Sequence, residues 1–195
     1  FESFRSISHC RAKSANNRYF GGLLVFIRNS IDKGVKIRNM NDADAIEIIL
    51  QKKVFNLRQD IKIIFAYTSP INSCYTKSRD MNILDKFETY LVDGKENYVI
   101  MGDLNGRTKT GTDFVNDGND KHSPVNVPLY SKDTPLERNN MDPHPIDEQG
   151  KKILELCKCV SVRILNGRTK GDERGNFTRY PQNINENPSV IDYGL

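Results

Sequence analysis

A carboxylate and a carboxamide stand two residues apart in the tetrapeptide GDLN at 102–105, directly after the apolar run Tyr98–Met101. A short, fully apolar run of this kind predicts a buried strand. Ligand sites of α/β sheets lie at the carboxyl ends of strands, so Asp103 and Asn105 could hold a divalent metal and a phosphate oxygen at once. A plain Asx turn is the alternative interpretation of this segment.

Two further segments place polar groups in or beside predicted strands. Tyr67 ends the apolar run IKIIFAY, and Asp192 lies inside the apolar segment Ser189–Tyr193. An acid in such a strand needs a partner, because burying an unpaired carboxylate is costly. An edge strand with Asp192 facing water is the alternative. We expect these two side chains to share one cleft with Asp103 and Asn105.

The elements that must position these groups follow from the hydrophobic pattern. Helical spacing predicts one helix from about residue 79 to a C-terminal cap at Gly94. A second helix carries Ile153, Leu154, Cys157 and Val160 at helical spacing, with the Asp147-Glu148 pair near its positive end. Strands are predicted at 23–31, 45–50, 61–67, 98–101, 161–165, 177–180 and 190–195, with an antiparallel hairpin over 45–67.

This order of elements predicts one α/β domain over 1–195 with a mixed sheet. The segment 107–145 is polar and lacks periodicity. A loop of that length is unusual in a compact domain unless it serves a function or is disordered.

The composition sets wide limits on function. The chain has 195 residues, 37% of them hydrophobic and 28% charged, which is typical of a globular protein. Its 29 Lys and Arg exceed its 25 Asp and Glu, so a polyanionic partner is permitted but not required. No apolar stretch approaches the ~20 residues of a membrane span. The four cysteines form no CxxC pair and are too few for a disulfide scaffold, which favours an intracellular protein, nuclear or cytoplasmic.

The polar motifs together resemble the endonuclease/exonuclease/phosphatase superfamily. AYTSP contains Tyr67, MGDLN contains Asp103 and Asn105, NFTRY contains Thr178, and SVIDY contains Asp192, all in that family's order and contexts. GGLLVFIRNSI, VIMGDLNGRT and GKKILELCKCVSVRILNGR further resemble the endonuclease domain of non-LTR retrotransposons. The resemblance covers nearly the whole chain. It implies a two-sheet α/β sandwich whose site lies where the strand ends of both sheets converge.

The resemblance also implies an activity, Mg²⁺-dependent hydrolysis of a DNA phosphodiester, with Mn²⁺ as an alternative metal. Asp103 would orient or deprotonate the attacking water. Asn105 would bind the scissile phosphate and, together with Asp103, the metal. Tyr67 would donate to the phosphate.

The remaining implied roles fall near the end of the chain. Thr178 and Ser189 would line the phosphate pocket, and Asp192 would hold a catalytic histidine in its working tautomer. In the parent protein, a linked reverse transcriptase domain would prime from the nicked DNA. No membrane partner is implied.

Parts of the family's site have no counterpart in residues 1–195. The family's metal-binding glutamate would lie upstream of Phe1, and its catalytic Asp-His pair beyond Leu195. We therefore expect a domain truncated at both ends, with no appreciable turnover from residues 1–195 alone. The histidines present, His9, His122 and His144, are interpreted as solvated loop residues.

Other interpretations remain open at this point. The same fold could act on a phosphomonoester such as a phosphoinositide, or the chain could be a catalytically dead remnant that binds nucleic acid. GRTKTGT at 106–112 only superficially resembles a phosphate loop, which needs Lys and Ser/Thr after its second Gly. The basic stretch 163–179 could follow a DNA backbone, although a solvated face is the simpler explanation.

Overall fold

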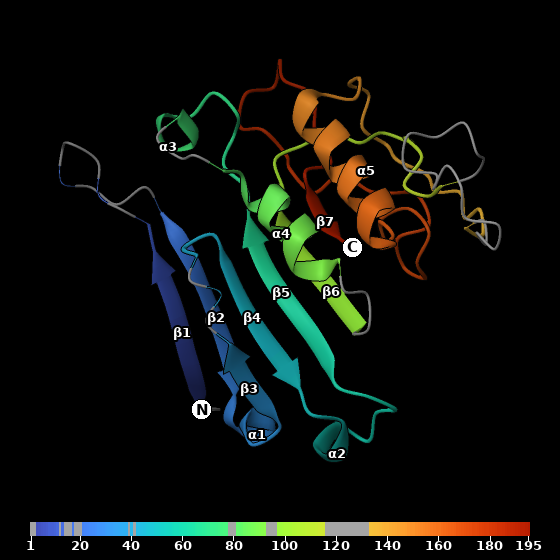
Figure 1. The fold of residues 1–195 in the computed structure, drawn as a ribbon. Helices are drawn as coiled ribbons and strands as arrows, with labels where there is room; N and C mark the ends of the chain where they lie inside the picture. Colours follow the sequence, from blue (N-terminus) through green and yellow to red (C-terminus); the bar gives the residue numbers. More distant parts are fainter. Residues whose placement is uncertain are drawn as a thin grey trace. The chain divides into compact units, whose positions relative to one another are not determined.

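The computed structural model describes residues 3–11, 13, 17, 21–38, 40, 42–77, 81–92, 97–115 and 133–195. They form a mixed α/β fold with a two-stranded antiparallel sheet, a larger mixed sheet and few helices (Figure 1). The chain divides into two compact units: unit 1 is Phe1–Ile83 with Lys95–Asp103, and unit 2 is Leu84–Gly94 with Leu104–Leu195. That the whole forms one domain stays a prediction.

Unit 1 consists mainly of strands. Its elements are β1 (Phe4–Cys10), β2 (Gly22–Arg28), α1 (Asn29–Asp32), β3 (Val35–Arg38), β4 (Ala45–Leu50), α2 (Lys52–Phe55), β5 (Ile61–Tyr67), α3 (Cys74–Lys77) and β6 (Asn97–Asp103). β1 and β2 pair antiparallel. In the larger sheet, β3, β4 and β5 are antiparallel neighbours, and β6 pairs with β5 in parallel.

Most strands predicted from the hydrophobic pattern of unit 1 are present in this ladder. The predicted hairpin over 45–67 is confirmed, because β4 and β5 are antiparallel with Ala45 opposite Ala66. The strand predicted at 98–101 is confirmed as β6. The strand predicted at 23–31 ends at Arg28, where α1 begins. β1 and β3 were not predicted, since neither has a long apolar run.

The core of unit 1 lies between β2 and the strands β3 and β4. Val25, Ile27, Val35, Ile46 and Ile48 form one buried cluster. The strict alternation of burial along β5 matches the two-residue period of a strand with one covered face. Strand periodicity is therefore the signal that this part of the sequence carries best.

The described residues of unit 2 form three elements, α4 (Ile83–Leu91, whose first residue belongs to unit 1), α5 (Glu148–Val160) and β7 (Asp192–Gly194). The second predicted helix is confirmed as α5, and Asp147 caps it by accepting a hydrogen bond from the Gly150 N–H at 2.7 Å. α4 confirms the first predicted helix, but Gly94 lies outside the described residues.

Several strands predicted for unit 2 are wrong. Residues 161–165 form no strand, because the Ile164 N–H donates to the Asp113 carboxylate at 2.8 Å instead of to a neighbouring strand. Residues 177–180 contribute only an isolated bridge between Arg179 and Ser189. The strand predicted at 190–195 is shorter, as β7. At Ile164 a side-chain acceptor takes the place of a ladder partner, which the apolar residue types alone do not reveal.

The long polar loop is confirmed over its described parts, 107–115 and 133–145, which contain no helix or strand. Its remainder, with His122, lies outside the described residues. Among the described residues, no helix is both long and apolar enough to cross a membrane.

Candidate functional site

In unit 1, Tyr67 and Asp103 lie side by side. They are register partners at the carboxyl ends of the adjacent parallel strands β5 and β6. The next residue, Thr68, donates its N–H to the Asp103 carbonyl at 2.8 Å. Residues in register point to the same face of a sheet, so the phenol and the carboxylate belong to one surface. This juxtaposition was predicted only as part of a larger cluster.

The glycine before Asp103 is required by the closeness of β5. Gly102 has a φ of +145°, and a Cβ built on it would lie 1.9 Å from the Ala66 carbonyl oxygen. Any side chain would therefore push β6 away from β5. The GD pair of the GDLN motif thus brings the Asp103 backbone to its register position opposite Tyr67.

A buried arginine holds the Tyr67 ring. The Arg11 guanidinium lies 4.2 Å from the centroid of the Tyr67 ring and 4.2 Å from that of Tyr75. Its Nε donates to the Asp44 Oδ1 at 2.5 Å, and its Nη2 donates to the Tyr67 carbonyl at 3.3 Å. Arg11 and Asp44 are both almost fully buried. A desolvated cation between two aromatic faces interacts strongly with both, so Tyr67 is fixed in orientation.

Backbone carbonyls of the same region hold His9, which lies on β1 and not in a solvated loop as predicted. Its Nδ1 lies 3.1 Å from the Asp42 carbonyl and 3.0 Å from the Ala45 carbonyl. Because carbonyls only accept, Nδ1 carries the proton. His9 is thus a structural donor that pins the turn before β4.

In unit 2, four predicted site residues gather around the segment 189–192. The Leu104 N–H donates to the Ile191 carbonyl at 2.9 Å, which brings the neighbouring Asn105 to this segment. The Thr178 hydroxyl oxygen accepts from the N–H groups of Ile191 and Asp192 at 3.0 and 3.1 Å. Asn105 has a φ of +48°, which asparagine tolerates better than most residues.

Ser189 belongs to the same group but is fully buried. Its backbone N–H donates to the Arg179 carbonyl at 3.0 Å, and its carbonyl accepts from Thr178 and Arg179. Its Oγ has no hydrogen-bond partner among the described residues. Its predicted contact with substrate stays a prediction.

A carboxylate does hold a histidine in unit 2, but the pair is Asp142 with His144. The buried Asp142 accepts from the His144 Nδ1 at 2.7 Å and from the Val190 N–H at 2.9 Å. His144 lies in the loop as predicted, with 32% of its side chain exposed, but it is paired with Asp142. The Asp192 backbone donates its N–H to Thr178 and accepts at its carbonyl from Asn166, and the histidine-holding role of its side chain stays a prediction.

The predicted site residues thus form two groups. Tyr67 and Asp103 belong to unit 1, and Asn105, Thr178, Ser189 and Asp192 to unit 2. The convergence of the two groups on one cleft stays a prediction.

The predicted metal donors fit magnesium in chemical type. Asp103 offers a carboxylate and Asn105 an amide oxygen, and Mg²⁺ is usually bound by one or two carboxylates with waters and substrate phosphates completing its shell. The described residues contain no group of three or more His, Cys, Asp or Glu side chains that could hold a metal alone. Substrate oxygens and water would have to supply the remaining ligands.

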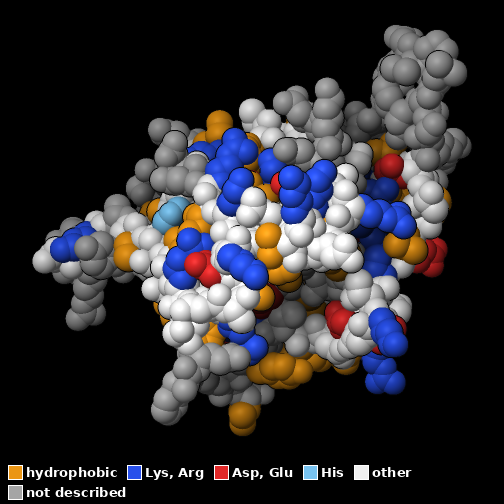
Figure 2. All heavy atoms as spheres, turned by 90° about the horizontal axis from the view of Figure 1, so that it is seen from below, with side chains coloured by type: hydrophobic (Ala, Val, Ile, Leu, Met, Phe, Trp, Pro, Cys, Tyr) orange, Lys and Arg blue, Asp and Glu red, His pale blue; other side chains and the backbone are white. Residues whose placement is uncertain are grey.

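The basic stretch 163–179 is partly committed to ion pairs within unit 2. Arg168 pairs with Asp113 at 2.9 Å, Arg163 with Asp133 at 3.0 Å, and Arg179 with Glu186 at 3.3 Å. Arg168 is buried, which excludes it from a solvated basic face. Lys and Arg side chains still outnumber acidic ones on the face drawn in Figure 2.

No protein-family model matches the chain, and no curated protein matches it. The residues that sequence reasoning missed are those that hold the site: Arg11, Asp44 and Asp142. Asp44 gave a weak signal, since it stands just before the apolar strand β4. Arg11 gave none, because its partners lie more than thirty residues away along the chain.

Proposed function

We propose that the protein is a magnesium-dependent endonuclease that cleaves a DNA phosphodiester, of the endonuclease/exonuclease/phosphatase type. The observation that carries the proposal is the parallel register of β5 and β6, which sets Tyr67 beside Asp103 on one face of the sheet. In that arrangement the hydrogen-bond donor would suit a phosphate oxygen, and the carboxylate would suit an attacking water.

Asp103 would orient the water and take its proton, which requires a carboxylate within hydrogen-bond reach of the nucleophile. Tyr67 would donate its phenol to a non-bridging phosphate oxygen. Because Arg11 packs against the Tyr67 ring and donates to its carbonyl, the phenol direction is set before substrate binds.

Thr178 would supply a second donor. Its oxygen already accepts two backbone hydrogen bonds, so its own O–H is left to donate. The side chain is exposed and can therefore meet a phosphate. The role of Asn105 is to bind the same phosphate. Asp103 and Asn105 would hold Mg²⁺, which would neutralise charge that develops on the phosphate and the leaving oxygen.

The biological setting proposed from the resemblance is target nicking for a linked reverse transcriptase, inside the nucleus or cytoplasm. All four cysteines are free thiols, which is consistent with a reducing compartment.

The test is plasmid nicking by the natural protein that carries residues 1–195, compared with its Asp103→Asn variant. We expect Asp103→Asn to lower magnesium-dependent nicking by about 10²-fold or more, because a general base contributes that much to rate. The matched control is Asp60→Asn, since Asp60 precedes the opposite end of β5 and is exposed. Equal nicking by both variants would refute the role of Asp103. Hydrolysis of a phosphomonoester without DNA cleavage would move the substrate to the phosphatase branch.

A further inference from the structure

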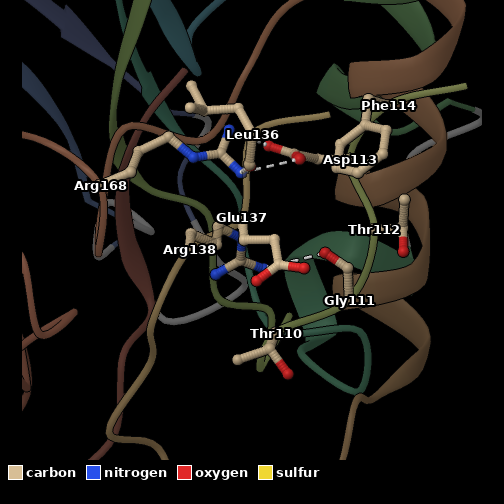
Figure 3. Close-up of a pocket in the computed structure, with 9 residues that line it drawn as sticks. All are labelled: Thr110, Gly111, Thr112, Asp113, Phe114, Leu136, Glu137, Arg138 and Arg168. Atoms are coloured by element: carbon tan, nitrogen blue, oxygen red, sulfur yellow. Dashed lines mark hydrogen bonds and ion pairs between the residues drawn. The ribbon is translucent and has the colours of Figure 1, made fainter. Parts of the chain in front are cut away.

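A pocket of about 400 Å³ lies within unit 2, and none of the predicted site residues lines it. Figure 3 shows the segment from Thr110 to Phe114 along one wall, with Leu136, Glu137, Arg138 and Arg168 facing it. The wall from Thr110 to Thr112 is the end of the GRTKTGT segment. None of these residues has a role in the proposed nuclease.

The two arginines of this pocket differ in how their charge is balanced. Arg168 donates from both terminal nitrogens to the Asp113 carboxylate, at 2.9 and 3.1 Å. The charges of this buried pair cancel. Arg168 also donates to the Leu136 carbonyl. Its Nε has no acceptor among the described residues, but its charge is paired with Asp113.

Arg138 forms no ion pair with a described residue, because the nearby Asp113 carboxylate is paired with Arg168. Only 6% of the residue is exposed, yet its Nη2 meets neutral oxygens alone: Thr108 Oγ1 at 2.9 Å, and the Thr108 and Gly111 carbonyls at 3.4 Å each. Its Nε and Nη1 have no acceptor among the described residues. Burial lowers the pKa of this guanidinium, because desolvation disfavours its charged form.

A buried cation without an anion is costly, and so are two buried donors without acceptors. A ligand in the pocket that carries negative charge and acceptor oxygens would lower the first cost, because it would balance the charge of Arg138. The planar fork of a guanidinium matches the oxygens of a phosphate in two parallel hydrogen bonds. Thr110 and Thr112 line the facing wall.

We propose that the Arg138 pocket binds a phosphoryl oxyanion, either free phosphate or a backbone phosphate of nucleic acid, with Arg138 as its anchor. The proposal is independent of the nuclease chemistry, because it concerns binding without turnover.

The exposed Glu137 offers a sharp test, because it lines the pocket without forming an ion pair with Arg138 and its carboxylate repels an anion. Inorganic phosphate would be titrated into residues 1–195 by calorimetry and ³¹P NMR at low salt. We expect one saturable site. Glu137→Gln should tighten phosphate binding about three- to fivefold by removing this repulsion. Glu88→Gln, the same change on the exposed face of α4, should leave affinity unchanged.

Arg138→Gln should weaken phosphate binding by about tenfold or more, the scale of a lost charge-assisted hydrogen bond. Its fold is checked by circular dichroism, and if it does not fold, Glu137→Gln still decides the question. No saturable phosphate binding, equal affinity in Glu137→Gln, or equal affinity for acetate would overturn the proposal.

A competition arm separates the two sources of phosphate. If a short DNA duplex displaces inorganic phosphate, and Glu137→Gln tightens duplex binding as well, the pocket takes a backbone phosphate. If phosphate binds but the duplex does not compete, the ligand is a free phosphoryl group. Failure of nicking by the natural protein would leave either result standing.

Discussion

Unit 1 and unit 2 hold their polar groups by different means. In unit 1, Tyr67 and Asp103 are positioned by the register of two parallel strands, with many backbone hydrogen bonds contributing to each position. In unit 2, aspartate side chains position the polar groups. Asp113, Asp142 and Asp147 each accept from backbone N–H groups of other segments.

This difference predicts how far a substitution should disturb the structure of each unit. A strand ladder distributes its hydrogen bonds over the whole chain segment, so one side chain changes little of it. A loop-rich unit depends on single buried carboxylates, each of which satisfies several donors at once. Substitutions should therefore act locally in unit 1 and broadly in unit 2.

The largest effect on stability is expected from Asp113→Ala. This change leaves the buried Arg168 without its partner and the Ile164 N–H without its acceptor. Breaking a buried ion pair by removing one member costs about 3–5 kcal/mol. The free energy of unfolding in urea measures this loss, and amide exchange should show it across unit 2.

The control for Asp113 is an ion pair of unit 2 that faces water. Arg179 and Glu186 are 43% and 52% exposed in their side chains, so Glu186→Gln should change stability by less than about 1 kcal/mol. If Asp113→Ala costs no more than Glu186→Gln, the carboxylates do not hold unit 2 together and the comparison fails.

A smaller and more local effect is expected from Arg11→Met in unit 1. Asp44 loses its ion pair but keeps the Tyr75 hydroxyl, 3.4 Å away, so we expect a loss of about 2–3 kcal/mol. Amide exchange should increase at the ends of β4 and β5 while their central amides stay protected. Tyr67→Phe, which keeps the ring over Arg11, should change stability by less than about 0.5 kcal/mol. Uniform exchange along β5 in Arg11→Met would contradict a local role.

The smallest effect is on the pH dependence of stability, which a buried acidic group, a thiol, controls in unit 2. Burial raises the pKa of the Cys157 thiol in unit 2 from 9.0 to about 12. The unfolded chain then releases this proton first, so the stabilisation is complete below pH 9 and is lost as pH rises toward 12. The loss should reach about 1.4 kcal/mol at pH 10, measured by urea unfolding at pH 8 and 10.

Burial also raises the pKa of Tyr193, which adds a loss of the same sign above pH 10. The control is Cys157→Ala, whose unfolding free energy should fall less over the same pH interval. At pH 8, a thiol reagent should label the exposed Cys10 and Cys74 of native unit 1 well before Cys157. Rapid labelling of Cys157 would show that it is not buried.

The sequence anticipated unit 1 far better than unit 2. The hairpin of β4 and β5 and the strand β6 are confirmed, because their apolar runs are long compared with the two-residue period of a strand. α5 is confirmed for a similar reason, helped by Asp147 at its start. The strands predicted at 161–165 and 177–180 are wrong. Ile164 donates its N–H to the Asp113 carboxylate, and Thr178 and Arg179 both donate to the single Ser189 carbonyl, so neither segment builds a ladder.

By itself, the sequence determined that β4, β5, β6 and α5 form, and it determined that a tyrosine and an acid end two of those strands. Both follow from periodicity and chemical type, which act over a few neighbouring residues. Only the tertiary structure decided that β5 and β6 are parallel neighbours, that Arg11 lies between Tyr67 and Tyr75, and that the carboxylate beside His144 is Asp142. Partner choice depends on the packing of the whole unit, because a buried charge takes the partner that folding brings within reach.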